Sequence, residues 1–433
     1  MIKNIPKAMA AMMLSFKLIL CLDKNWETYK SSGLYKVREV EIKEVEKMLM
    51  CMNPENGYTA YICSSCGEVK ILPHSCKSRI CSVCGKRHAD EWSEKINKEM
   101  YAVPYRHIIM TVSDKLWSYF EGNSKLQKIM LDTAATVMKD IVKEGNKGKD
   151  KKAEPGIIVV LHPFGRDLKT NMHVHMLMTE GGLTPSGKWI PMPYIDYNTI
   201  RKKWQYYILT ALRKAMPGDK GLAEIIDWCF KERSKGFNIQ AKRRIEGNTR
   251  QATRYMARYV RHPAIADSRI INYDNDTENV TYVYDREGKR NTVVMNKYEF
   301  IHNVIKHIPD SNFKMIRYFG IHARRAKKAA RIAMDKLGLL VEYVAKPFSW
   351  RNNVKEYTGK DPLKCDKCNG DMLFYKTVYR NKSGELKVYG GLNLLLKKII
   401  SGSFISNEQK EEKPDKARDM EGKETEYCQL CLC

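Results

Sequence analysis

The sequence lacks several features that would place it in other classes of protein. No apolar run approaches the length that a helix needs to cross a bilayer, so a membrane-spanning protein is not expected. No G-x-x-x-x-G-K-[ST] motif occurs, which excludes a P-loop helicase within these residues. No internal repeat is found either. The sequence is therefore expected to form neither a membrane-spanning nor a P-loop protein.

Acidic residues are scarce relative to basic ones. The chain of 433 residues holds 50 Asp and Glu against 76 Lys and Arg, a formal net charge of +26. Such an excess favours a polyanionic partner, above all nucleic acid, although a solvated basic surface or an anionic membrane face would also produce it. Hydrophobic residues make up 43% of the chain, enough for a sizeable core and two or three domains.

The first residues, "MIKNIPKAMAAMMLSFKLILCL", superficially resemble a signal peptide. Lys17 interrupts the apolar run, however, and no small-residue cleavage site follows it cleanly. We interpret the segment as an N-terminal helix and expect the protein to be cytoplasmic.

The thirteen cysteines include four CxxC pairs, which in an intracellular protein indicate metal sites. Cys63 and Cys66 are separated from Cys81 and Cys84 by fourteen residues. Each pair forms a turn that directs two thiolates at one ion, so the two turns together predict one closed, structural zinc site.

The remaining cysteines leave alternatives open. Cys51 and Cys76 could build a second site, or they could be buried thiols. Cys365 and Cys368 could join Cys428 and Cys431 in another zinc ribbon across a long polar segment.

Two histidines lie in the stretch "NMHVHMLM", which reads as a buried strand. His173 and His175 are two residues apart, so in a strand they face the same side. The apolar segments 156–164 and 173–182 are joined by "GRDLKTNM", which suits a hairpin, and His162 then lies beside the pair. Three imidazoles on one face would bind a divalent cation and leave positions open for a substrate. The alternative is that His162 ends a strand while the other two histidines face solvent.

Hydrophobic periodicity predicts the other elements. We expect a helical N-terminal region through about residue 48 and a strand at 105–112. Further helices are expected at 124–145, 196–216, 249–262, 297–307 and 323–338, with short strands at 279–285 and 291–295.

A second constellation, "TRQATRYMARYVRHPAI", contains Tyr255 and Tyr259, which share one face of the predicted helix. Arg254, Arg258 and Arg261 surround them with positive charge. A tyrosine hydroxyl among arginines is a plausible nucleophile toward a phosphodiester, because the cations stabilise the phenolate and the charge of the transition state. Most Tyr-x-x-x-Tyr pairs are packing pairs, and the spacing also occurs at Tyr101/Tyr105 and Tyr375/Tyr379.

Taken together, these motifs resemble those of the HUH (His-hydrophobic-His) single-strand endonucleases, most closely the rolling-circle transposases of the IS ninety-one group. The matching segments run in family order over roughly residues 50 to 375. They are "SCKSRICSVCG", "PGIIVVLHPFGRDLKTNMHVHMLMTEGGL", "YMARYVRHPAIADSRI", "HIPDSNFKMIRYFGIHARR" and "DPLKCDKCNGDM".

The resemblance implies an α+β fold, with a ferredoxin-like antiparallel sheet and an N-terminal zinc ribbon. It implies Mg²⁺ or Mn²⁺ on His173, His175 and His162, and attack by Tyr255 or Tyr259 to give a 5′-phosphotyrosine. Implied partners are single-stranded DNA, held in part by basic helices that include Arg324 and Arg325, and a host helicase.

On this reading the chain divides into a helical region (1–48), a zinc-binding domain (49–95) and an endonuclease domain (100–330). A basic CxxC region (331–375) and a mostly disordered tail (376–433) follow. Two alternatives would account for some of the same motifs. One is a plasmid replication initiator or relaxase with the same nuclease core, and the other is a zinc-ribbon DNA-binding protein without catalysis.

Overall fold

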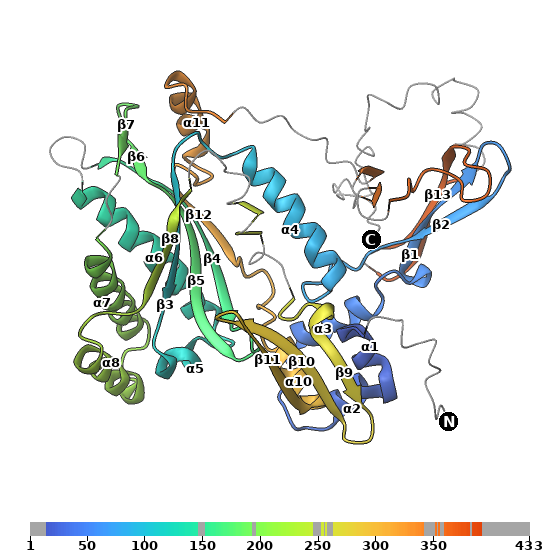
Figure 1. Cartoon of the computed structure of the whole chain (residues 1–433), viewed down its shortest axis with the longest axis horizontal. Helices are drawn as coiled ribbons and strands as arrows, with labels where there is room; N and C mark the ends of the chain where they lie inside the picture. Colours follow the sequence, from blue (N-terminus) through green and yellow to red (C-terminus); the bar gives the residue numbers. More distant parts are fainter. Residues whose placement is uncertain are drawn as a thin grey trace. The chain divides into compact units, whose positions relative to one another are not determined.

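The computed structural model describes residues 14–145, 152–192, 196–245, 253–254, 256–257, 263–341, 351–352, 354–355, 359–381 and 383–391. The chain forms two compact units (Figure 1). The large unit comprises Met1–Val45 and Gly85–Ala345, and the small unit comprises Glu46–Cys84 and Lys346–Cys433. Within the described ranges, no helix is long and apolar enough to cross a membrane.

A five-stranded antiparallel sheet forms the centre of the large unit. Its strand order is β12-β4-β5-β3-β8. The strands are β3 (Tyr105–Thr111), β4 (Gly156–Phe164), β5 (Thr170–Thr179), β8 (Ile239–Ile245) and β12 (Ile316–Gly320). The predicted strand at 105–112 and the predicted hairpin of the histidine strands are confirmed.

Strands β4 and β5 are buried on both faces, which explains why their sequences are nearly continuous apolar runs. On one face Val159 and Val174 belong to the larger hydrophobic core. On the other, Ile158, Val160 and Leu177 belong to a second core. Alternation along the strands therefore assigns each side chain to one of two packed layers.

Three helices pack against the first face: α6 (Ser124–Gly145), α7 (Tyr197–Ala215) and α8 (Lys220–Glu232). Each begins at a capping side chain, because Asn123, Asp196 and Asp219 accept hydrogen bonds from backbone amides of the first turn. Helix α7 ends at Ala215, two residues before Pro217, whose ring and missing N–H cannot continue a helix. The predicted helices at 124–145 and 196–216 are confirmed.

The second face is covered by residues from several segments. These include Ile96 in α4 (Ser82–Asn97), Met334 in α11 (Lys327–Lys336), and Met256. Most of the helix expected at 249–262 lies outside the described residues. Thr253, Arg254, Met256 and Ala257 are described, and they are helical.

A smaller sheet with the order β11-β10-β9 completes the large unit, together with the first helices of the chain. Phe16 packs edge-on against Phe300, and the Tyr29 hydroxyl lies 3.1 Å from His302 Nδ1. The smaller sheet consists of β9 (Ile270–Asp274), β10 (Asn279–Arg286) and β11 (Lys289–Asn296). The other elements of the large unit are α1 (Phe16–Cys21), α2 (Asn25–Ser31), α5 (Trp117–Phe120), α10 (Lys297–Ile305) and the two-stranded sheet of β6 (Gly181–Leu183) and β7 (Trp189–Pro191), with 3₁₀ turns at Leu22–Lys24, Asp114–Leu116 and Asp267–Arg269. The strands predicted near 279–285 and 291–295 and the helix predicted at 297–307 are confirmed.

The small unit is built on a four-stranded sheet of order β14-β13-β1-β2, in which every neighbouring pair is antiparallel. Its strands are β1 (Gly57–Cys63), β2 (Val69–Pro73), β13 (Met372–Arg380) and β14 (Leu386–Gly390). Helix α3 (Glu39–Leu49) and a 3₁₀ turn at Pro54–Asn56 precede β1. Gly57 has φ 121°, and a Cβ there would lie 2.7 Å from the Val378 carbonyl oxygen, so the β1–β13 contact requires glycine. The sheet thus joins segments about 310 residues apart in sequence.

Candidate functional site

Three histidines meet on the second face of the large sheet. His162 on β4 pairs directly with His173 on β5, and His175 lies two residues further along. His162 Nδ1 is 3.0 Å from His173 Nε2, and His173 Nε2 is 3.2 Å from His175 Nε2. Val174, between the two β5 histidines, is fully buried in the core of the opposite face. Strand alternation and register therefore bring three imidazoles to one point.

These imidazoles are largely withdrawn from water. His173 and His175 are buried and His162 is half-buried, so the alternative of solvent-facing histidines is wrong. Burial lowers the pKa of His173, and burial followed by the charges of His173 and His307 holds the pKa of His162 well below its usual value. Neutral imidazoles present lone pairs, the form in which histidine binds a metal ion. The cluster can thus hold a cation through three nitrogen atoms.

The outer nitrogens of two of these rings also have partners. His173 Nδ1 lies 2.7 Å from the carbonyl oxygen of Asn171, to which it can only donate. His175 Nδ1 lies 3.0 Å from Nε2 of His107, a buried residue on β3. Both contacts leave the Nε2 atoms directed at the shared point. The role of His107 was missed in the sequence, and only the pairing of β3 with β5 would have revealed it.

The tyrosine segment approaches the same face of the sheet. Met256 is fully buried in the same core as Val160 and Leu177. These two residues lie two positions from His162 and His175 along their strands, and therefore on the same face of the sheet. Thr253 anchors this turn, since its hydroxyl donates to Asn97 Oδ1 at 2.6 Å. The predicted site residues Tyr255, Tyr259, Arg258 and Arg261 lie outside the described residues. Arg254 is described and exposed, as are Arg324 and Arg325 just before α11.

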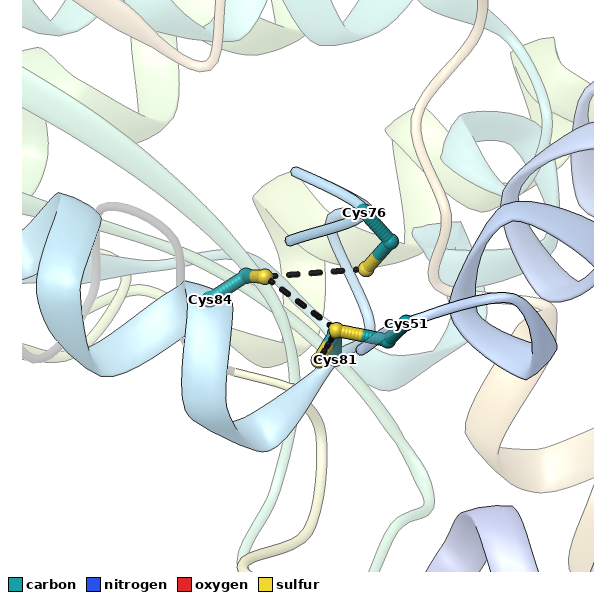
Figure 2. A group of neighbouring side chains, drawn as sticks. All are labelled: Cys51, Cys76, Cys81 and Cys84. Atoms are coloured by element: carbon teal, nitrogen blue, oxygen red, sulfur yellow. Dashed lines mark hydrogen bonds between the residues drawn. The ribbon is translucent and has the colours of Figure 1, made fainter. Parts of the chain in front are cut away.

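A cluster of four thiols occupies the start of the small unit. Cys51, Cys76, Cys81 and Cys84 point toward one another (Figure 2). Cys84 Sγ lies 3.8 Å from Cys51 Sγ and 3.6 Å from Cys76 Sγ, and Cys81 Sγ lies 3.7 Å from Cys51 Sγ. Cys51, Cys81 and Cys84 are buried, and Cys76 is half-buried. Cys51 and Cys76, left open in the sequence, are therefore members of this cluster.

A second thiol cluster joins Cys63 and Cys66 with Cys365 and Cys368. The prediction of one site made by Cys63, Cys66, Cys81 and Cys84 is therefore wrong. The physical reason is strand pairing: β13 pairs with β1 so that Cys63 faces Met372, and this pairing brings the later CxxC turn beside the first. Cys428 and Cys431, the other predicted partners of Cys365 and Cys368, lie outside the described residues.

Two family models match parts of the chain. Residues 156–330, which contain the histidine cluster, match a family described as "Putative transposase". Residues 21–112, which contain the first thiol cluster, match the transposase zinc-binding domain. No solved structure matches the chain significantly.

These matches define the chain as a transposase with a zinc-binding domain, and hence as a DNA-cleaving enzyme. It is the transposase of a rolling-circle insertion sequence, similar to known relatives over most of its length. The transposase for insertion sequence element IS801 of Pseudomonas savastanoi pv. phaseolicola is 28% identical over 361 residues, which cover 79% of this chain and 85% of the relative. "Putative transposase y4qJ" of Sinorhizobium fredii is 22% identical over 377 residues, covering 81% of this chain and 94% of the relative.

Proposed function

We propose that this transposase cuts single-stranded DNA at a divalent cation held by His162, His173 and His175, with Tyr255 or Tyr259 as the nucleophile. The observation that carries the proposal is the convergence of three imidazole nitrogens within 4.8 Å on one face of the sheet. A purely DNA-binding zinc protein has no need for such a cluster. Comparison with transposases favours this function over replication initiation.

The three imidazoles lie close enough together to hold one ion. His173 Nε2 is 3.0 Å from His162 Nδ1 and 3.2 Å from His175 Nε2. Three nitrogen ligands would leave coordination positions for phosphate oxygens, the hard ligands that Mg²⁺ or Mn²⁺ prefers. When bound, the cation polarises the scissile phosphate.

The chain itself supplies the nucleophile and the surrounding charge. The tyrosine Oη forms a bond to phosphorus while the bond from phosphorus to the 3′ oxygen breaks. This leaves a 5′-phosphotyrosine and a free 3′-hydroxyl, because the phenolic proton passes through solvent to the departing 3′ oxygen. Because the link conserves the phosphodiester bond, joining needs no ATP, and a second tyrosine permits a second cut before the first is resolved. The position of Met256 on the histidine face supports this role for its neighbours.

The topology of the sheet supports the assignment to the HUH endonucleases. The order of elements is β3, α6, β4, β5, then α7 and α8, then β8, and these strands lie in the order β4-β5-β3-β8. That is the arrangement of a ferredoxin-like fold, with β12 added beside β4. The two histidines of β5 thus lie on the central strand of this sheet.

The first thiol cluster is a structural zinc site of the matched zinc-binding domain. A tetrahedral zinc ion with Zn–S bonds of about 2.3 Å separates its sulfur ligands by about 3.8 Å. The sulfur separations of 3.6 to 3.8 Å in this cluster fit that geometry. Four thiolates leave no open position, so this zinc serves the fold.

The partner of the site is DNA held mostly through its phosphates. Arg254, Arg324 and Arg325 are exposed cations of the large unit that can contact the backbone. Since the chain has no Walker A motif, strand separation would depend on a host helicase. The protein would then work in the cytoplasm, at the nucleoid.

The proposal is tested by incubating the full chain with single-stranded oligonucleotides carrying the ends of the element, with and without Mn²⁺. We expect a protein–DNA adduct that survives denaturation and forms only with the cation. His173→Ala with His175→Ala should abolish the adduct and leave the zinc content unchanged. An adduct that persists in that variant, or its absence from the wild type across all end sequences, would overturn the proposal.

A further inference from the structure

The second thiol cluster unites two segments from opposite ends of the sequence. Cys63 is the last residue of β1 and Cys66 follows it, while Cys365 and Cys368 precede β13. Cys368 Sγ lies 3.5 Å from Cys63 Sγ and 3.4 Å from Cys66 Sγ, and Cys66 Sγ lies 3.7 Å from Cys365 Sγ. Cys63 and Cys66 fall within the range that matches the zinc-binding domain, 21–112. Cys365 and Cys368 lie outside both matched family ranges.

The two CxxC turns have the same backbone hydrogen bonds. The amide of Gly67 donates to the Cys63 carbonyl at 3.1 Å, and the amide of Asn369 donates to the Cys365 carbonyl at 3.0 Å. Gly67 and Asn369 both have positive φ, 73° and 58°. Amides of Cys63 and Cys365 in turn donate to carbonyls five residues ahead, at Glu68 and Gly370. Equivalent turns facing one another are the arrangement of a zinc ribbon.

The two turns also lie close together. A Cβ at Gly370 would lie 2.6 Å from Ser65 Oγ and 3.1 Å from Cys63 Sγ, so the side chains of the first turn pack directly against the backbone of the second. The Ser64 amide donates to the Asp371 carbonyl at 3.0 Å, which fixes one turn against the other. Sulfur separations of 3.4 to 3.7 Å exclude disulfide bonds and lie close to the edge of about 3.8 Å expected around tetrahedral zinc.

The hydrophobic core beside the cluster is too small to hold this region together. It consists of Cys63, Cys365 and Met372, with Tyr61 and Leu363 packed against it. Regions with so few buried apolar side chains need a metal or disulfides for stability. The ion pairs between the segments contribute little, since the side chains of a pair such as Lys367 and Glu68 are largely open to solvent.

We propose that Cys63, Cys66, Cys365 and Cys368 bind a second structural zinc ion, which fastens the C-terminal segment to the N-terminal zinc-binding domain. The nuclease residues lie between the two halves of this site in sequence, so the zinc closes a loop of about 300 residues. Loop-closure entropy rises only slowly with length, so one zinc site can offset it. The proposal does not depend on the chemistry of the histidine cluster.

Zinc content of the full-length protein gives the first test. We expect two zinc ions per chain in the wild type, one in Cys365→Ser with Cys368→Ser, and one in Cys76→Ser with Cys84→Ser. Cys21→Ser, which alters an exposed cysteine outside both clusters, should retain two. Two ions in the first variant, or a single ion in the wild type, would overturn the proposal. The measurement uses neither DNA nor a catalytic cation, so its failure leaves the proposed nuclease site untouched.

Thiol alkylation of the wild type provides a second test that needs no variant to fold. Cys66 and Cys368 are exposed, so burial alone does not protect them from iodoacetamide. Bound zinc should slow their alkylation at least about tenfold relative to exposed Cys21, and a chelator should remove the difference. Alkylation of both residues as fast as Cys21 in the zinc-loaded protein would contradict the proposal.

Discussion

Nε2 of His107 lies 3.0 Å from Nδ1 of His175, across the pair of strands β3 and β5. His107 is buried and its ring is nearly parallel to that of His175. His107 therefore orients the ring of His175, which is directed at the proposed cation. His107 itself is not part of the group formed by His162, His173 and His175.

Loss of this positioning contact should weaken cation binding. We expect His107→Ala to lower the affinity for Mn²⁺ about 10- to 100-fold, the usual cost of removing the partner of a metal-binding histidine. His107→Gln, which retains a polar group, should recover part of that affinity. Calorimetric titration with Mn²⁺ measures both, and equal affinities in all three proteins would show that His107 has no positioning role.

DNA binding by the exposed arginines before α11 should depend on salt. Arg324→Ala with Arg325→Ala removes two candidate phosphate contacts, so the slope of log K against log salt should fall by about 1.4 for a single strand. Arg213→Ala on α7 is the matched control, because it removes one exposed arginine from a helix packed on the opposite face of the sheet. Fluorescence anisotropy over a series of salt concentrations gives the slopes. A change no larger than that of the control would exclude these arginines from the DNA-binding surface.

Acid should destabilise the large unit through His322. Burial, followed by the charge of Lys327, lowers the pKa of His322 to about 4, and its Nε2 lies 3.2 Å from the Tyr105 hydroxyl. Between pH 6.5 and about 4 the unfolded chain binds the extra proton, so stability is lost as the pH falls through that window and is unaffected above it. The loss attributable to this residue is at most about 3 kcal/mol.

Urea unfolding at several pH values tests this expectation. His322→Gln cannot titrate, so its free energy of unfolding should fall less steeply between pH 6.5 and 4 than that of the wild type. Some slope should remain, because burial also lowers the pKa of His307, to about 3. Identical slopes in the two proteins would remove His322 as a source of acid sensitivity.

Local sequence patterns were sufficient to predict the histidine strands. The apolar runs of β4 and β5 and their short connection predict a hairpin in which His162 lies beside the other two histidines, and the structure pairs His162 with His173. His107 could not be found in this way, because β3 and β5 are separated by α6 and β4 and pair only in the folded chain. Periodicity identifies strands but not their non-local partners.

The cysteines show the same limit more sharply. A CxxC spacing predicts a turn that directs two thiolates at one ion, but it does not identify the second turn. Proximity in sequence favoured Cys81 and Cys84 as partners of Cys63 and Cys66, whereas the β1–β13 pairing selects Cys365 and Cys368. Cys51 and Cys76, with no motif of their own, complete the other cluster only through the fold.

The most direct test of the account is to identify the residue to which DNA becomes attached. The adduct formed with Mn²⁺ would be digested and the nucleotide-bearing peptide sequenced by mass spectrometry. We expect a 5′-phosphate on Tyr255 or Tyr259, and no adduct from Tyr255→Phe with Tyr259→Phe, which should still bind DNA because only the hydroxyl groups are lost. A nucleotide on any other residue, or an undiminished adduct in the double variant, would contradict the central claim.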